Sequence, residues 1–285
     1  MNIQSNWRKA LEKALPPSSS PLYQKYLDWH LNVEARARVI EHNLNKFISL
    51  ENLKILDFGC GEGGMSVYFA RKGFEVWAVD IDREKLARVK LRAEENEVKI
   101  NILPLSPEGR AENLPENYFE VILCLDVIEH CQDPRLSLRE MKRLLKKEGL
   151  LYLTTPNQLG LGWLFSDPHY SLPFLTLFPK PIADYLVKRF RKMENDVSHL
   201  FGRRELEKLF QKTGLEVIYS YADEVKEKLN QPERIVSPFK KKVFQILSSA
   251  HLIGLIPIFL PLLHYFSTTL IYILKKLPEN GPTPF

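Results

Sequence analysis

The amino-acid sequence predicts an α/β protein with a mostly parallel β-sheet. Short apolar segments that favour strands alternate with helical segments between residues 54 and 155, which is the pattern of successive β–α–β units. The apolar run at 118–127, YFEVILCLDV, is nearly continuous, as is typical of a central strand covered on both faces. A glycine-rich segment at 57–64 joins the first strand to the helix that follows it.

The individual elements follow from the local sequence. We expect strands at 54–59, 75–80, 100–105, 118–127 and 150–155, and helices at 62–71, 83–95 and 134–147. Asp82 is a good N-cap for the second of these helices, and Gly149 ends the third. A helix at 203–212 and a strand at 215–221 continue the alternation. The β-branched segment at 267–274 favours one more strand.

The composition is that of a globular protein with a sizeable core, because 45% of the 285 residues are hydrophobic and 26% are charged. The net charge of +5 suits an anionic ligand, a nucleic acid or a membrane surface and selects none of them. The three cysteines, Cys60, Cys124 and Cys131, have no paired spacing, and the N-terminus has no apolar signal region. We therefore expect a reducing, cytoplasmic location.

The turn DFGCGEGG at 57–64 carries the clearest indication of function. Gly59, Gly61 and Gly64 fit the spacing G-x-G-x-x-G, and Asp80 follows one β–α unit later at the end of the second strand. A dinucleotide site has the same pattern, and a plain strand-to-helix turn is the structural alternative. The residues other than glycine must therefore decide between these interpretations.

Two carboxylates beside this turn argue against a dinucleotide. Asp57 precedes the glycines and Glu62 lies among them, where a pyrophosphate would need backbone N–H groups and would be repelled by negative charge. S-adenosylmethionine has no phosphate and carries an ammonium, a sulfonium and two ribose hydroxyls. Asp80 would accept the ribose hydroxyls, and Asp57 would lie beside the ammonium, directly or through water.

Four segments, in order along the chain, resemble the motifs of class I S-adenosylmethionine-dependent methyltransferases, particularly the branch that contains the ubiquinone-biosynthesis O-methyltransferases. They are ILDFGCGEGG (55–64), VDID (79–82), AENLPENYFEVILCLDVIEHCQDP (111–134) and EMKRLLKKEGLLYLTTPN (140–157). The resemblance implies a Rossmann-like class I methyltransferase fold, whose seven-stranded sheet is mostly parallel with the last strand antiparallel. It also implies S-adenosyl-L-methionine as the cofactor. Residues 268–274 would supply the last strand, beside 215–221.

The resemblance also indicates which residues bind the cofactor. They are Asp57, Gly59, Gly61, Gly63, Asp80, Ile81, Ala111, Glu112 and Leu125. The family often has an acid just before Ala–Glu that holds the adenine amino group, whereas this chain has Arg110. Adenine recognition would then fall to the backbone near Ala111 or to Glu112.

Methyl transfer to an oxygen needs a base that removes the hydroxyl proton, or a metal ion that lowers its pKa. The segment LDVIEH ends the fourth strand at the edge where such sheets bind ligands, and it carries Glu129 and His130. We predict that these two residues are catalytic, with His130 as the general base. A structural role for His130, hydrogen-bonded under the loop, is the alternative.

The same segment also supports a metal hypothesis. Asp126, Glu129 and His130, together with His199 further along, resemble a set with which some relatives bind a divalent cation. Mixed oxygen and nitrogen ligands suit Mg²⁺, Mn²⁺ or Zn²⁺ without selecting one, and Asp126 reaches less far than a glutamate at that position. His199 could instead cap the helix that follows it. The sequence therefore does not decide whether the protein binds a metal ion.

The chain divides into six segments. We expect an N-terminal helical cover (1–50), a cofactor-binding core (51–158), an acceptor-side lid (159–197), a continuation of the core (198–222), a charged linker with an apolar helical insertion (223–266), and a last core strand with a tail (267–285). The lid contains His169 and Tyr170 in an aromatic and proline-rich context. The cover is helical because apolar residues recur at helical spacing between Tyr23 and Phe47.

The apolar insertion at 243–266 raises the question of a membrane. It is part of an uncharged stretch, 243–274, that lysines flank on both sides, and Pro257 and Pro261 interrupt its most apolar part. A spanning helix, a core-packed insertion, and a surface that lies on a membrane or binds lipid are the three alternatives.

The sequence as a whole predicts an S-adenosylmethionine-dependent methyltransferase that acts on a hydroxyl of a lipophilic small molecule or lipid-linked acceptor. The alternatives are an NAD-dependent oxidoreductase with the same glycine turn and a non-catalytic, membrane-associated binding protein. The methyltransferase prediction includes a peripheral membrane contact through 243–266. A nucleic-acid partner is not expected, because the basic residues are not interleaved with aromatic residues on which bases would stack. The oligomeric state stays open.

Overall fold

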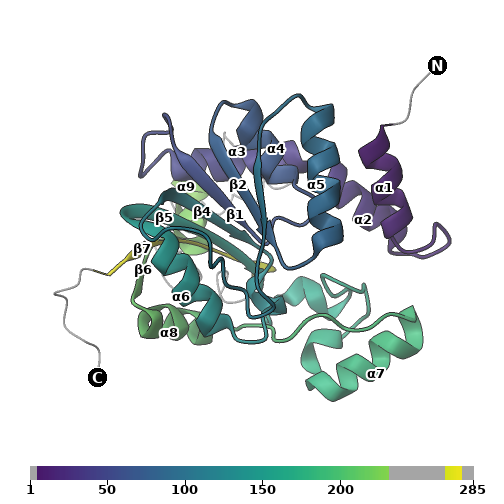
Figure 1. The fold of residues 1–285 in the computed structure, drawn as a ribbon. Coiled ribbons are helices and arrows are strands. Elements are labelled where there is room, and N and C mark those ends of the chain that lie inside the picture. Colours follow the sequence, from purple (N-terminus) through teal and green to yellow (C-terminus); the bar gives the residue numbers. More distant parts are fainter. Residues whose placement is uncertain (1–4, 231–266, 278–285) are drawn as a thin grey trace.

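The computed structural model describes residues 5–230 and 267–277, and these contain a seven-stranded sheet (Figure 1). The strand order is β3-β2-β1-β4-β5-β7-β6. The strands are β1 (Lys54–Phe58), β2 (Glu75–Asp80), β3 (Asn101–Pro104), β4 (Phe119–Leu125), β5 (Leu145–Pro156), β6 (Leu215–Ser220) and β7 (Thr269–Lys276). Strands β1 to β5 pair in parallel, and β7 lies antiparallel between β5 and β6. The predicted fold class, including the antiparallel last strand, is confirmed.

Helices cover both faces of the sheet. They are α1 (Asn6–Ala14), α2 (Tyr23–Leu31), α3 (Val33–Leu44), α4 (Gly64–Arg71), α5 (Arg83–Glu95), α6 (Pro134–Leu144), α7 (Lys180–Arg191), α8 (Arg203–Thr213) and α9 (Tyr221–Asn230), with short 3₁₀ turns η1 (Ile128–His130), η2 (Leu161–Leu164) and η3 (Leu175–Leu177). One buried cluster joins the sheet to α6 and α8, and a second joins its opposite face to α3 and α4. This alternation follows from the strands: Leu56 faces the first cluster and its neighbour Ile55 the second.

The junction between α6 and β5 differs from the prediction. The helix ends at Leu144 and the strand begins at Leu145, whereas the sequence predicted a helix to 147 and a strand from 150. The chain therefore passes from the helix into the strand without a loop. Both leucines are fully buried. Leu145 pairs with Phe119, and the ladder is irregular before Val121 pairs with Leu150.

The segment between β5 and α8 contains η2, η3 and α7, and in Figure 1 it extends away from the sheet. It has a small apolar cluster of its own around Tyr170 and Val187. Two backbone N–H groups, those of Ser198 and His199, donate to the carbonyl oxygen of Glu129, at 2.8 and 3.0 Å. The residues that directly follow 159–197 are therefore attached beside the carboxyl end of β4, and the name lid is kept for 159–197 as a prediction.

The predicted apolar insertion at 243–266 lies outside the described residues. Among the residues that the structure does describe, no helix has both the length and the hydropathy needed to cross a bilayer.

Candidate active site

The glycine turn between β1 and α4 is held by Asp80 at the end of β2. The Asp80 carboxylate is 6% exposed and accepts two backbone hydrogen bonds, from Gly61 N and from Asp82 N, each at 2.9 Å. Gly59 and Gly61 have φ angles of +74° and +53°, a region that other residues rarely adopt. Asp80 thus fixes the turn and lies at its edge, where the sequence placed it.

The two glycines differ in their surroundings. A Cβ at Gly59 would lie 2.6 Å from a methyl group of Val127, so this position is closed by packing. A Cβ at Gly61 would meet no atom within 4 Å, so the backbone there borders open space. An open backbone beside a buried carboxylate fits a bound nucleoside, which needs close approach to the chain.

Asp57, at the end of β1, lies near Asp80. Its carboxylate is 4% exposed and accepts a hydrogen bond of 2.6 Å from the Ser66 hydroxyl. Burial raises the pKa of Asp57 to about 6, and the nearby charge of Asp80 adds to the rise. The two buried carboxylates therefore lie close enough to interact, one at each side of the glycine turn.

Glu62 corrects one step of the argument against a dinucleotide. Its carboxylate is turned toward α5, where it is 6% exposed and forms a two-pronged ion pair with Arg88, with two contacts of 2.9 Å. Arg92 donates a further hydrogen bond to the Glu62 carbonyl oxygen. The charge of Glu62 is thus neutralised within the protein, and Asp57 and Asp80 supply the negative field at the turn.

The predicted adenine-binding residues have mixed surroundings. Ile81 is 62% exposed directly after Asp80, so it offers an apolar surface at the crevice. Glu112 is exposed, whereas Leu125 is partly buried at the end of β4. Both backbone groups of Ala111 are already bonded, its N–H to Glu140 and its carbonyl oxygen to Arg143. Ala111 is therefore less free to contact a base than the sequence suggested.

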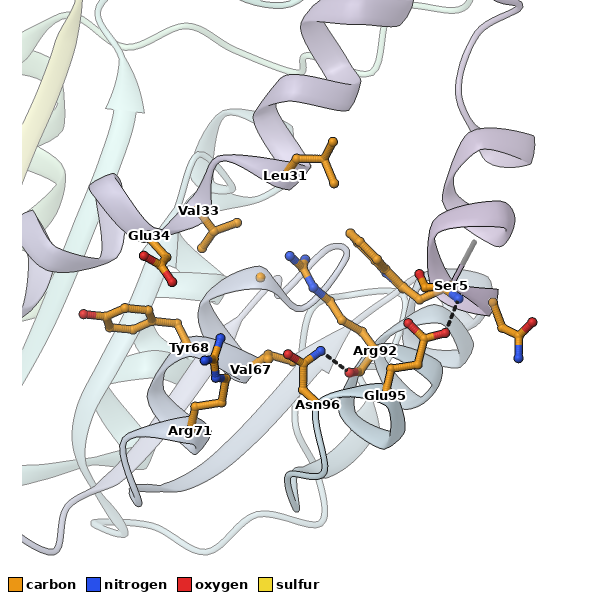
Figure 2. A pocket seen from close by; sticks show the side chains of 13 residues that line it. Ser5, Leu31, Val33, Glu34, Val67, Tyr68, Arg71, Arg92, Glu95 and Asn96 are labelled. Atoms are coloured by element: carbon orange, nitrogen blue, oxygen red, sulfur yellow. Dashed lines mark hydrogen bonds between the residues drawn. The ribbon is translucent and has the colours of Figure 1, made fainter. Parts of the chain in front are cut away.

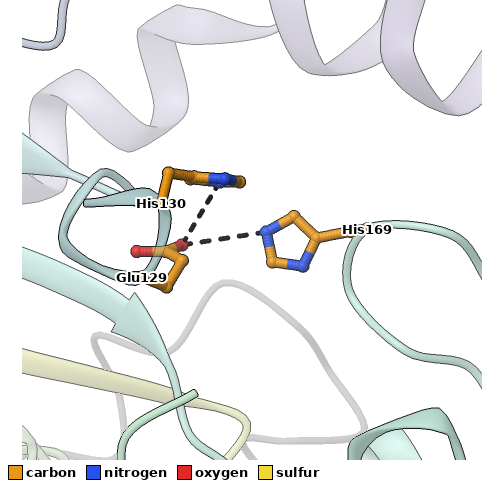
Figure 3. Close-up of side chains that lie close together, drawn as sticks. All are labelled: Glu129, His130 and His169. Carbon is orange, nitrogen blue, oxygen red and sulfur yellow. Dashed lines mark ion pairs between the residues drawn. The ribbon is translucent and has the colours of Figure 1, made fainter. Parts of the chain in front are cut away.

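Glu129 and His130 form a cluster with His169, which the lid supplies (Figure 3). The Glu129 side chain is fully buried, and its Oε2 accepts a hydrogen bond of 3.0 Å from the Thr155 hydroxyl. The other carboxylate oxygen, Oε1, lies 4.0 Å from Nε2 of His130 and 3.8 Å from Nε2 of His169. Among the described residues, Oε1 has no hydrogen-bond partner.

The hydrogen bonds of His130 define its tautomer. Its Nδ1 lies 3.0 Å from the carbonyl oxygen of Asp196, which can only accept, so Nδ1 carries the proton of the neutral ring. Nε2 then presents a lone pair toward Glu129. A buried carboxylate oxygen and an imidazole lone pair converge here, and this arrangement is suited to receive a proton or a cation.

The set of residues predicted for a metal ion is rearranged in the structure. His199 is turned away: its Nε2 contacts Glu205 at 2.9 Å, and its ring packs on Phe201. His169 occupies the place expected for His199, because the lid folds back over η1. Asp126 accepts a hydrogen bond from Thr154, and burial, with the charge of Glu129, raises its pKa to about 6.

Arg36 of α3 is a site residue that the sequence analysis did not identify. Its guanidinium packs on the Trp29 ring at 3.5 Å and donates to the Trp29 carbonyl oxygen at 2.6 Å. Burial lowers the pKa of Arg36, and the charge of Asp126 opposes that effect. The helical cover therefore brings a partly buried cation toward the end of β4. No motif marked Arg36, since this contact depends on how α3 crosses the sheet.

A second group of residues encloses a cavity of about 250 Å³ within the lid. His169 and Tyr170 line it, together with apolar residues of η3, α7 and the segment after α7. The hydroxyl of Thr176 also lines this cavity, is buried, and has no hydrogen-bond partner in the described part of the chain. The cavity adjoins the Glu129 cluster through His169.

The family model of the methyltransferase domain matches residues 29–220, well over half of the chain. The chain belongs to this methyltransferase family. Its fold and motifs identify it as a class I S-adenosylmethionine-dependent methyltransferase, and S-adenosyl-L-methionine is its cofactor. The buried acid pair, the open backbone at Gly61 and the exposed Ile81 fit that cofactor. The two alternative functions, an oxidoreductase and a non-catalytic binding protein, have no support from these comparisons.

Curated relatives of this methyltransferase include the ubiquinone biosynthesis O-methyltransferase of Pelagibacter ubique, which is 31% identical over 151 residues. The enzyme of the same name from Pseudomonas fluorescens SBW25 is 32% identical over 123 residues. The aligned segments cover 50% and 43% of this chain and 62% and 53% of the two relatives. The methyltransferase thus spans less than two-thirds of the length of either one.

Solved structures share the fold of this methyltransferase at low sequence identity. An S-adenosylmethionine-dependent methyltransferase from Clostridium acetobutylicum superposes with a TM-score of 0.52 at 13% identity, covering 87% of this chain and 92% of the other. One from Methanosarcina mazei gives 0.51 at 18% identity, covering 83% and 97%. At these identities the likeness supports the fold.

Proposed function

We propose that this methyltransferase transfers a methyl group to a hydroxyl oxygen of a lipophilic small molecule. The observation that carries the proposal is the buried Oε1 of Glu129, which faces the imidazole nitrogens of His130 and His169 without a hydrogen-bond donor among the described residues. A hydroxyl group would supply the missing donor. The relatives named as O-methyltransferases support the same type of acceptor atom.

The cluster would act on the acceptor as a base. The bound cofactor supplies an electrophilic methyl group, whose bond to sulfur breaks as a bond to the acceptor oxygen forms. A neutral hydroxyl is a poor nucleophile, so the proton that it first shares with Oε1 of Glu129 would pass to the neighbouring Nε2 of His130 during transfer. The negative charge of Glu129 would stabilise the resulting imidazolium, and Thr155 holds that carboxylate in place.

Two acidic groups and one basic group would orient the cofactor at the neighbouring strand ends. Asp80 would accept the ribose hydroxyls, since its carboxylate already borders the open backbone at Gly61. Asp57 would lie beside the ammonium group. Arg36 would pair with the carboxylate of the methionine moiety, because it is a partly buried cation directed toward the end of β4.

A divalent cation is the second way in which the cluster could act. The Glu129 oxygen and one nitrogen each of His130 and His169 lie within 4.8 Å of one another, a donor set suited to such an ion. The ion would lower the pKa of the acceptor hydroxyl. Dialysis against EDTA followed by addition of Mg²⁺, Mn²⁺ or Zn²⁺ separates the two modes, because base catalysis survives dialysis and metal catalysis requires the ion to be restored.

The lid supports a lipophilic acceptor. Apolar and aromatic side chains, among them Leu175, Phe178 and Val197, line one part of its cavity, and polar groups such as the Thr176 hydroxyl line the rest. Large apolar side chains on the lid are also exposed, among them Phe165 at 79% and Leu177 at 58%. We infer that the acceptor has a polar, hydroxylated head beside Glu129 and an apolar body against the lid.

A peripheral membrane contact would deliver such an acceptor. Helix α7 exposes Ile182, Tyr185 and Phe190 beside the basic residues Lys188 and Arg189. This combination suits an anionic lipid surface, and the apolar segment 243–266 would add to the contact. Co-sedimentation should show binding to phosphatidylglycerol vesicles that Y185E weakens. Equal recovery with phosphatidylcholine vesicles would contradict an electrostatic contribution.

The function is tested with tritium-labelled S-adenosylmethionine and two acceptors, catechol and 4-nonylcatechol. We expect a labelled methyl ether and a KM for the alkylated acceptor about ten-fold or more below that for catechol, because the lid would bury the alkyl chain. Methylation of neither catechol, alongside normal binding of S-adenosylhomocysteine, would count against a phenolic hydroxyl as acceptor. A KM equal for both would contradict the apolar acceptor site.

A further inference from the structure

A cavity of about 590 Å³ lies between the N-terminal helices and helices α4 and α5 (Figure 2). Helices α1, α3, α4 and α5 and the end of α2 form its walls. Gly64, the first residue of α4, belongs to its floor. The cavity shares no lining residue with the cavity of the lid, and Gly64 is the one residue of the 57–64 turn among its described lining residues.

Two hydrogen-bond donors that line this cavity have no partner among the described residues. Trp7 is 6% exposed, and its indole Nε1–H is buried without a partner among the described residues. Arg71 reaches the same space from α4 and forms no ion pair within the described part of the chain. Figure 2 shows Arg71 and Arg92 extending from neighbouring helices toward the same opening. A buried N–H without an acceptor is costly, so a ligand that accepts hydrogen bonds would be favoured.

The two carboxylates that line the cavity already have partners. Glu34 pairs with Arg38 at 3.0 Å, and Glu95 accepts the backbone N–H of Trp7 at 2.9 Å. Glu34 is also largely exposed to solvent, so its field is screened. Both carboxylates thus have a partner. The buried Trp7 indole N–H and the exposed Arg71 guanidinium have none among the described residues, and both groups favour an anion.

The remaining walls are apolar or aromatic. Leu31, Val33 and Val67 line the cavity with the ring of Tyr68, and the Trp7 ring is fixed by the Arg92 guanidinium, 4.0 Å from its centroid. These surfaces suit the body of an organic molecule rather than an inorganic ion.

Arg92 connects this cavity to the cofactor turn. Its Nη1 donates a hydrogen bond of 3.0 Å to the carbonyl oxygen of Glu62, which lies within the turn. A Cβ at Gly64 would lie 3.1 Å from the same Nη1 atom. A ligand that moves the Arg92 guanidinium would therefore act on the backbone that presents Gly61 to Asp80.

We propose that this cavity binds a small organic anion, a carboxylate or a phosphate monoester with an apolar body, and that its occupancy changes the affinity of the glycine turn for the cofactor. The anionic group would be held by Arg71 and the Trp7 indole. Its body would lie between Val67, Val33 and Tyr68.

Binding is tested by NMR on the ¹⁵N-labelled full-length protein, with phenyl phosphate as the probe and the Trp7 indole N–H signal assigned through W7F. That signal should shift saturably with a Kd of about 1 mM or below, and R71Q should raise the Kd about five-fold or more. R83Q, a substitution at the far end of α5, should leave the Kd unchanged. Benzoate in place of phenyl phosphate distinguishes a carboxylate from a phosphate ligand.

The proposal fails if the Trp7 signal does not respond to either anion, if neutral benzyl alcohol shifts it equally, or if R71Q binds as tightly as the wild type. Calorimetry tests the coupling separately. Phenyl phosphate at the wild-type Kd should change the Kd for S-adenosylhomocysteine in the wild type, and the change should be smaller in R71Q at the same concentration. An unchanged Kd for S-adenosylhomocysteine in both proteins would overturn the coupling between the cavity and the cofactor turn. Both measurements detect binding, so they are independent of whether the protein methylates the proposed acceptor.

Discussion

Nε2 of His169 lies 3.8 Å from Oε1 of Glu129, although the histidine belongs to the lid and the glutamate to the end of the sheet. The contact brings the lid onto the cluster that would deprotonate the acceptor. H169N should therefore lower kcat by about 10-fold, because His169 faces the carboxylate that stabilises the protonated His130. The Kd for S-adenosylhomocysteine should stay within about two-fold, since His169 touches none of the cofactor residues.

Two matched histidine variants accompany this prediction. H42N replaces an exposed histidine of α3 and should behave as the wild type. H199N should cost less than H169N, because the His199 ring is bonded to Glu205 rather than to Glu129. A larger loss of kcat in H199N than in H169N would favour the metal-binding set predicted from the sequence, which includes His199.

Asp80 should be essential for cofactor binding. D80N exchanges a carboxylate for an amide of the same size, so it removes the charge that would accept two ribose hydroxyls and weakens the hold on Gly61 N. We expect the Kd for S-adenosylhomocysteine to rise by about 10²-fold, measured by calorimetry. D82N, which alters an N-cap two residues on, should change it little. Equal affinities of D80N and the wild type would exclude the proposed role.

The glycines of the turn offer a pair of variants that separate stability from binding. G59A should lower the free energy of unfolding by more than about 2 kcal/mol, because its Cβ would meet Val127 at 2.6 Å and its φ is positive. G61A carries the strain but no clash, so it should cost about 1 kcal/mol. Its methyl group would project into the open space, and cofactor affinity should fall. Urea unfolding and calorimetry on both variants check this, and normal affinity of G61A would count against a cofactor there.

Asp57 should make stability depend on pH. Its pKa is raised from 3.8 to about 6 in the folded protein, so the folded state binds more protons than the unfolded state between these values. The contribution of Asp57 is therefore fully present below pH 3.8 and is lost as pH rises through 6. It amounts to about 3 kcal/mol.

D57N removes this dependence. The variant should be more stable than the wild type above pH 6, and the difference should vanish toward pH 4, as measured by urea unfolding across that range. Cofactor affinity should fall at the same time. A stability difference that does not change with pH would contradict the raised pKa.

Local sequence was sufficient for the sheet and for the cofactor turn. The positive φ angles at Gly59 and Gly61 follow from a tight strand-to-helix turn that only glycine enters easily. The last strand, predicted at 268–274, was found at Thr269–Lys276, because its β-branched residues fit a buried strand between two neighbours. The spacing of hydrophobic residues and the preference of turns for glycine depend on residues that are neighbours in the chain. Both features can therefore be identified in the sequence alone.

Contacts between distant segments were not visible in the sequence. His169 meets Glu129 because the lid folds back on η1, and nothing in the spacing of the two residues indicates this. The pairing of Glu62 with Arg88 similarly depends on how α5 packs beside the turn, and it removed a charge on which the sequence argument relied. Arg36 was missed for the same reason, since α3 carries no motif that marks it.

The account depends most on the buried carboxylate of Glu129, so the most direct measurement is the single-turnover rate of methyl transfer to 4-nonylcatechol by wild type and E129Q at saturating cofactor. Glutamine keeps the size of the side chain and its contact with Thr155. We predict a labelled methyl ether from the wild type, a rate at least about 10²-fold lower in E129Q, and an unchanged Kd for S-adenosylhomocysteine. Equal rates in the two proteins would contradict the account.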